Sequence, residues 1–153
     1  MKVEYMEPFV QAARSVIEGL VGCSARPGAI GLAGSTFTSG TTNLAAIVSG
    51  ELSGDVMYSM SGETAERLAS AISGTQVRAF GRSMGHGLSQ LGVLLAEQTR
   101  RTLDEHGYVC EVGRPIVFQA MNVEFSVAEP ALSVPVETEI GQLNVSVAVR
   151  NGQ

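Results

Sequence analysis

The first residue whose type and setting could do chemistry is Ser83, in the segment Gly81-Arg82-Ser83-Met84-Gly85. This G-x-S-x-G spacing is typical of a hydrolase whose serine nucleophile sits on a sharp turn between a strand and a helix. The preceding run 76–80 favours a strand and the following residues favour a helix, so the setting fits. Such chemistry also needs an acid and a histidine beside the serine.

The downstream candidates for those two partners are Asp104 and His106. Both lie about five to six turns beyond Ser83 on the same predicted helix, which is too far for contact. We therefore expect Ser83 to cap the helix while the flanking glycines let the chain turn. A serine hydrolase that uses Ser83 is kept only as an alternative function.

The second candidate is a stripe of side chains along the helix predicted between Ser83 and Gly107. Its members follow one another at spacings of four, three, four and three residues, namely His86, Gln90, Val93, Glu97 and Arg100. This spacing keeps them on one side of a helix, so the apolar Val93 lies beside Gln90 at the centre of a polar face. The opposite face is apolar at similar spacing, with Met84, Leu88, Leu91 and Leu95. We expect that face to pack on a core and to leave Gln90 and Val93 exposed.

Two further helices are predicted before this one. An apolar face over residues 9–20 follows a proline suited to a first helical turn, and Gly22 is a typical helix stop. The next helix is predicted to begin at Ser61 or Gly62 and to end before Gly74. Together with the helix that carries the candidate residues, the sequence therefore predicts about three helices.

Short apolar runs separated by glycines predict strands in the first half of the chain. Residues 29–33 and 44–48 suit strands, and 44–48 is expected to pair with 56–60 as a hairpin. The turn is predicted over residues 49–54, which have a glycine near each end and can adopt positive φ angles.

In the second half, residues 123–127 and 143–149 alternate apolar and polar side chains, which predicts half-buried strands. Residues 115–118 and 132–136 are two more candidates, and the prolines near the latter push it toward a sheet edge. The predicted fold class is α+β, with an antiparallel β-sheet packed on one side against about three helices.

Length and charge limit the classes of partner. The chain has 153 residues with 44% hydrophobic content, so we expect one domain over residues 1–153. Its net charge of −5, with ten lysines and arginines and no basic run, argues against nucleic acid as a partner. The longest apolar runs, 44–48 and 91–96, are too short to insert in a membrane, and the first residues do not resemble a signal peptide. We therefore expect a cytoplasmic protein.

No cofactor or metal is predicted. Cys23 and Cys110 are too few for a disulfide framework and lack zinc-site spacing, so we expect both to be small buried hydrophobes. His86 and His106 have no carboxylates at ligand spacing that would complete a metal site. The glycines of 28–34 do not form a dinucleotide fingerprint, and no lysine follows them as a phosphate loop would require.

Three segments, in the same order, resemble the CheX and CheC chemotaxis phosphatases. The opening residues 5–10 resemble the start of their first helix, and residues 47–56 resemble their glycine-punctuated hairpin. Residues 134–141 are similar to the stretch before their last strand. The resemblance implies a CheC/CheX-like fold and a phosphorylated response-regulator receiver domain as partner. By resemblance to CheX it also implies a homodimer, for which the C-terminal strands are expected to offer an exposed edge.

The functional helix of that family carries a Glu-x-x-Asn pair, and the segment that resembles it here is Ser89-Gln90-Leu91-Gly92-Val93. The resemblance implies that the glutamate contacts a lysine of the receiver, while the asparagine positions the water that attacks the aspartyl phosphate. Gln90 and Val93 stand at these two positions, so the catalytic pair is degenerate. Gln90 can still hydrogen-bond a lysine, but Val93 cannot orient a water. We expect phosphatase activity to be impaired or lost.

The expected partner-binding residues are the whole stripe, His86, Gln90, Val93, Glu97 and Arg100. A non-catalytic module that binds a receiver or another partner is the alternative to an enzyme. An ordinary helix surface with one exposed valine is a further interpretation, since single exposed apolar residues are common.

Overall fold

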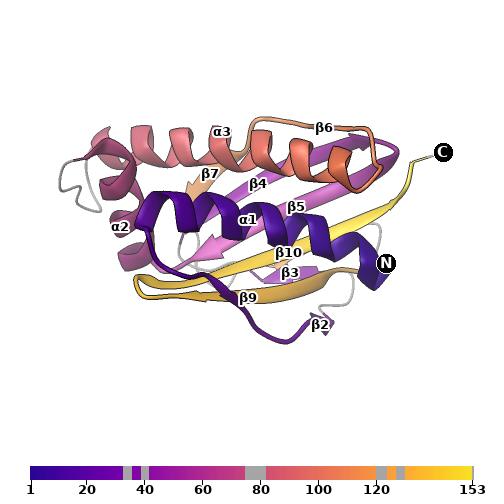
Figure 1. Ribbon diagram of the computed structural model, residues 1–153, viewed down its shortest axis with the longest axis horizontal. Coiled ribbons are helices and arrows are strands. Elements are labelled where there is room, and N and C mark those ends of the chain that lie inside the picture. The colour runs from indigo at the N-terminus through magenta and orange to yellow at the C-terminus, as the bar shows by residue number, and fades with distance from the viewer. Residues whose placement is uncertain (33–35, 39–41, 75–81, 120–123, 127–129, 153) are drawn as a thin grey trace.

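The structure, a computed structural model, describes residues 1–32, 36–38, 42–74, 82–119, 124–126 and 130–152 (Figure 1). Three α-helices, α1 (Met6–Val21), α2 (Gly62–Ser73) and α3 (Arg82–Glu105), form one layer, and an eight-stranded sheet forms the other. Figure 1 shows α1 and α3 side by side across one face of this sheet, with α2 near one end of α3. The predicted α+β fold class is confirmed.

The large sheet is antiparallel throughout, with the strand order β1-β9-β10-β5-β4-β6. Two further strands complete it, because β2 also pairs with β9 and β7 also pairs with β4. Strand β10 therefore joins β9 to β5. The strands are β1 (Arg26–Pro27), β2 (Gly31–Leu32), β4 (Thr42–Gly50), β5 (Leu52–Met60), β6 (Cys110–Val112), β7 (Ile116–Gln119), β9 (Leu132–Thr138) and β10 (Gly141–Asn151).

The predicted hairpin is confirmed as β4 and β5, which pair from Thr42 opposite Met60 to Val48 opposite Gly54. Its strands are longer than predicted and leave only Glu51 between them. Gly54 has a φ of 153°, and a Cβ at this position would collide with a carbonyl of β10. Glycine is therefore required at this position of β5, beside β10.

The first two helices have the predicted ends. Ser61 caps α2, since its Oγ accepts a hydrogen bond from the backbone N–H of Thr64 at 3.1 Å. Gly22 ends α1 and Gly74 ends α2, with φ angles of 72° and 74° respectively. These left-handed angles are those that glycine adopts without a steric penalty.

Helix α3 begins at Arg82, so Ser83 already lies inside the helix and our expectation that it caps the helix is wrong. The other end closes with a Schellman motif. Gly107 has a φ of 89°, and the backbone N–H of Tyr108 donates to the carbonyl of Leu103 at 2.9 Å. The motif satisfies carbonyl groups that the helix end would otherwise leave unpaired.

The core lies between the helices and the sheet. The predicted buried face of α3 is confirmed, since Met84, Leu88, Leu91 and Leu95 are all at most 4% exposed. Below α3, the hydroxyl groups of Tyr58 and Thr99 lie 3.1 Å apart, and both residues are fully buried. Burial raises the pKa of Tyr58 to about 12, and the hydrogen bond to Thr99 acts in the opposite direction.

Several strand predictions need correction. Residues 143–149 lie in β10 as predicted, but Ser146 and Ala148 are buried as well as their apolar neighbours, so the strand is not half-buried. The reason is a small second cluster of apolar residues on the other face of the sheet, which covers Ala148. Strand β10 has a partner strand on both sides over residues 143–147, so this part of it is not an edge, and the predicted dimer edge stays a prediction.

The predicted strands 115–118 and 132–136 are confirmed as β7 and β9, while two other predicted strands differ from expectation. Among the residues that the structure describes, strand β9 has on its outer side the two-residue strands β1 and β2, which agrees with a position near an edge. Of residues 29–33, only β2 is a described strand. The centre of 123–127 is β8 (Glu124–Ser126), which pairs with β3 (Thr36–Thr38) in a separate sheet. The predicted strand 76–80 lies outside the described residues.

The cysteines differ from one another. Cys110 is 6% exposed, as expected, and burial raises the pKa of its thiol. Cys23 is only half-buried, so our expectation of a buried hydrophobe is wrong there. It follows the last residue of α1 and the turn at Gly22, where the chain leaves the helical layer.

Candidate functional site

Helix α3 is held close to its neighbours by two glycines. A Cβ on Gly87 would lie 2.8 Å from the Cβ of Ala69 in α2, which is closer than two such atoms approach. A Cβ on Gly92 would lie 3.3 Å from the ring of Pro115, just before β7. Because both positions lack a side chain, α3 packs tightly on α2 and on the sheet and presents one fixed face outward.

All five residues of the predicted stripe lie on the exposed side of α3, namely His86, Gln90, Val93, Glu97 and Arg100. The exposed fraction of Val93 is 40%, and Leu94 beside it is 41% exposed. Sequence patterns missed Leu94, which adds a second apolar group to the centre of the face. The structure thus brings the stripe together, while its role in binding stays a prediction.

Two short-range contacts order the polar side chains of this face. The side-chain nitrogen Nε2 of Gln90 lies 3.4 Å from Nε2 of His86, one turn earlier. The carboxylate of Glu97 forms an ion pair with Arg101 at 2.8 Å, and the guanidinium belongs to a residue outside the predicted stripe. Glu97 is therefore neutralised by a neighbour on its own helix.

A hollow flanks the exposed face on each side. The hollow toward α1, the α1-side hollow, has a volume of about 370 Å³. It is lined by Ser15, Val16, Gly19 and Leu20 of α1 and by Leu94, Glu97, Gln98 and Arg101 of α3. The hollow toward β6, the β6-side hollow, has a volume of about 310 Å³ and is lined by Val93, Ala96, Glu97, Arg100, Val112 and Arg114. Val93 and Leu94 thus stand on the ridge between two hollows.

The serine hydrolase alternative fails on distance. Ser83 lies in the first turn of α3, whereas His106 follows the last turn and contacts the carbonyl of Thr102 through Nδ1 at 2.8 Å. At the rise per residue of an α-helix, Ser83 and His106 are about 34 Å apart. Asp104 and His106 therefore cannot act on Ser83, and a triad that uses them is excluded.

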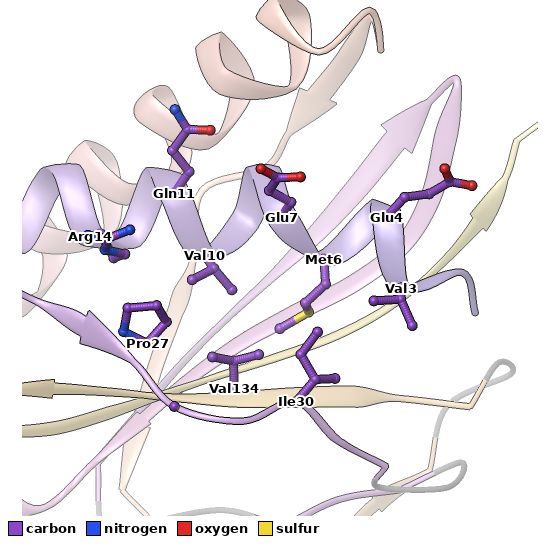
Figure 2. A pocket seen from close by; sticks show the side chains of 11 residues that line it. Val3, Glu4, Met6, Glu7, Val10, Gln11, Arg14, Pro27, Ile30 and Val134 are labelled. Carbon is purple, nitrogen blue, oxygen red and sulfur yellow. The ribbon is translucent and has the colours of Figure 1, made fainter.

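A larger hollow of about 590 Å³ lies on the other side of α1, against the segment that contains β1 (Figure 2). Met6 and Val10 point from α1 toward Ile30 and Val134 and form its apolar floor. The carboxylate of Glu7 points away from this floor. The polar groups therefore line the rim and do not converge on a ligand, and the hollow is a weaker candidate than the face of α3.

The described residues offer neither a metal site nor a membrane-spanning helix. In the described ranges, no three histidine, cysteine, aspartate or glutamate side chains gather as metal ligands would. None of the helices in the described part of the chain combines the length and apolar character that a membrane crossing requires.

Comparison with known proteins identifies the fold. No protein-family model and no curated protein matches the sequence. The chemotaxis protein CheX from Desulfovibrio desulfuricans has a similar structure, with a TM-score of 0.84, 18% identity, and coverage of 97% of this chain and 100% of that chain. A putative chemotaxis protein from Desulfovibrio vulgaris Hildenborough has a TM-score of 0.81 and 18% identity, with 97% of each chain covered.

A third similar structure contains a partner. The CheX–CheY–BeF3–Mg²⁺ complex from Borrelia burgdorferi has a TM-score of 0.74 to this chain at 23% identity, over 97% of this chain and 99% of that chain. These likenesses define the class of fold. The chain has the CheX/CheC-like fold of chemotaxis proteins over nearly its whole described length.

Proposed function

We propose that this chain binds the receiver domain of a response regulator through the exposed face of α3, and that it hydrolyses the aspartyl phosphate slowly or not at all. The observation that carries the proposal is the exposed Gln90–Val93 pair on the long helix of a CheX/CheC-like fold. A complex of CheX with CheY in a similar structure supports a receiver as the partner. Such docking would take place in the cytoplasm, where we expect the protein to act.

The chemistry of the two side chains supports binding more than catalysis. The Gln90 amide can accept a hydrogen bond from a lysine ammonium of the receiver, although without the ion pair that a glutamate would form. Val93 has neither donor nor acceptor. Hydrolysis of an aspartyl phosphate depends on positioning a water for in-line attack. Loss of a group that orients or stabilises the reacting atoms costs on the order of a hundredfold in rate.

The test compares phosphate loss from phosphorylated receiver domains of the source organism with and without this protein. We expect the wild-type protein to leave the receiver's own rate of dephosphorylation unchanged. The double variant Gln90→Glu/Val93→Asn is expected to accelerate it. The matched control is Gln90→Glu/Leu94→Asn, because Leu94 is as exposed as Val93 but lies one residue further around the helix.

Three outcomes decide among the interpretations. Acceleration by the wild-type protein as large as that by Gln90→Glu/Val93→Asn would overturn the proposed impairment of activity. Acceleration by both double variants, or by neither although binding persists, would show that Gln90 and Val93 are not the positions of the catalytic pair. Failure of every receiver to bind would overturn the proposed function itself.

The homodimer implied by the resemblance to CheX also stays a proposal. Sedimentation equilibrium between 1 and 100 micromolar, on the order of common dimer affinities, tests it: a mass that stays near the 16.0 kDa of one chain throughout this range contradicts the dimer.

A further inference from the structure

We infer that the β6-side hollow receives an acidic side chain of the docked partner, held between Arg100 and Arg114. The inference rests on the proposed function, because the hollow adjoins the proposed docking face through Val93. It names the chemistry by which this chain recognises a receiver away from the phosphorylated residue. Helix α3 provides Arg100, and the loop after β6 provides Arg114.

The β6-side hollow carries a positive charge. Arg100 and Arg114 both line the hollow and are exposed, and the structure gives neither an ion-pair partner among the residues it describes. Among the described residues that line the hollow, Glu97 is the acidic one, and its carboxylate is already paired with Arg101 at 2.8 Å. A chain with a net charge of −5 therefore presents a positive hollow at this place. An anion that enters it gains two guanidinium partners.

The β6-side hollow also combines apolar and charged groups. The apolar part of the lining consists of Val93 at the rim, Ala96 and Val112, while the guanidinium groups contribute the polar part. A glutamate or aspartate side chain matches both, because its methylene stem packs on apolar atoms and its carboxylate accepts paired hydrogen bonds from arginine. The neighbouring exposed apolar groups Val93 and Leu94 favour a protein surface as the source of that carboxylate.

The position of Arg100 along α3 determines which part of the partner it would meet. Arg100 lies ten residues beyond Gln90, about 15 Å along the helix axis. A receiver whose phosphorylation site faces Gln90 and Val93 therefore meets Arg100 with a different part of its surface. The two arginines act on affinity and on the choice of receiver, while the Gln90–Val93 pair determines the chemistry.

The experiment measures the dissociation constants of the source organism's receiver domains, each activated with beryllofluoride and Mg²⁺, by calorimetry at 50 and 500 mM salt. The variant Arg100→Ala/Arg114→Ala is expected to bind about three- to tenfold more weakly than wild type at 50 mM salt. The difference is expected to shrink at 500 mM salt because salt screens exposed charges. The charge-conserving variant Arg100→Lys/Arg114→Lys is expected to keep most of the affinity.

The matched control is Arg26→Ala/Arg67→Ala, which removes the same two charges from exposed positions on β1 and α2. We expect it to bind within about twofold of wild type, since distant exposed charges contribute little. Equal losses in both double variants, or no loss in either, would overturn the inference while leaving receiver binding intact. If no receiver binds the wild-type protein, the proposed function and this inference both fall.

Discussion

The hydroxyl groups of Tyr58 and Thr99 lie 3.1 Å apart in the core and join strand β5 to helix α3. Both residues are completely buried, so water cannot replace either partner. The contact fixes α3 about two turns from the Gln90–Val93 pair. A polar bond in this position restricts how the helix can rotate on the sheet, which matters because rotation would move the exposed face.

Tyr58→Phe is expected to lower the free energy of unfolding by about 1–2 kcal/mol, because the Thr99 hydroxyl loses its buried partner. Tyr58→Phe/Thr99→Val removes both hydroxyl groups and is expected to recover most of that loss. Urea unfolding at neutral pH measures both variants. The single variant Thr99→Val is measured in the same way. If the double variant loses more free energy of unfolding than the two single variants lose together, this account is contradicted.

The same tyrosine predicts a dependence on pH. The folded protein raises the pKa of Tyr58 from 10.0 to about 12, so it holds the phenol proton more tightly than the unfolded chain does. This contribution to stability is complete below about pH 10 and is lost as the pH rises toward 12. We expect wild type to lose about 2–3 kcal/mol more than Tyr58→Phe across that window. Parallel losses in the two proteins would exclude Tyr58 as the cause.

Replacement of either of two glycines of α3 by alanine should change the free energy of unfolding, but in opposite directions. Gly87→Ala is expected to lower the free energy of unfolding by about 1–3 kcal/mol, because its Cβ would meet Ala69 at 2.8 Å and force α2 and α3 apart. Gly85 has nothing within 4 Å of such a Cβ, so Gly85→Ala is expected to raise stability by about 0.5–1 kcal/mol. Chemical unfolding compares them, and stabilisation by both substitutions would show that the helices can separate freely.

The two thiols should differ in reactivity. Cys110 is buried, its pKa is raised by burial, and its sulfur accepts a hydrogen bond from the backbone N–H of Leu52 at 3.4 Å. Cys23 is half-buried, so Ellman's reagent is expected to modify it first. Cys110 should react only as the protein unfolds. Fast release of two equivalents from folded protein would contradict the packing around β6, and Cys23→Ser identifies which thiol reacts.

The cap of α2 provides a further test. Ser61→Ala removes the hydrogen bond to the N–H of Thr64 and is expected to cost about 1 kcal/mol. Ser89 is an exposed serine inside α3, and Ser89→Ala is expected to change stability by less than about 0.5 kcal/mol. Thermal unfolding of the two variants gives the comparison. A similar loss from both would mean that the cap contributes nothing specific.

The sequence predicted the elements whose signals are local. The helix stops at Gly22 and Gly74 and the cap at Ser61 depend on residues within one turn, and all three were found. The hairpin of β4 and β5 follows from two apolar runs around a glycine-bounded turn. The exposed face of α3 follows from spacing alone, because the period of a helix determines which side chains share a side.

The failures depend on contacts between distant residues. Strands β1, β2 and β6 have two or three residues each, too few to show a period. The burial of Ser146 and Ala148 depends on what covers the second face of the sheet, which β10 itself does not encode. The sequence also contained no sign that Arg114 lines the same hollow as Arg100, since the loop after β6 brings the two residues to that hollow.

Strand β10 has a consequence for how the chain folds during synthesis. Its two neighbours, β9 and β5, are not paired with each other, and more than seventy residues separate them in sequence. Until residues 141–151 have left the ribosome, the hairpin of β4 and β5 lacks the strand that links it to β9. The surface beneath α1 and α3 therefore closes late, and a nascent chain must keep that apolar surface from other molecules until its last long strand arrives.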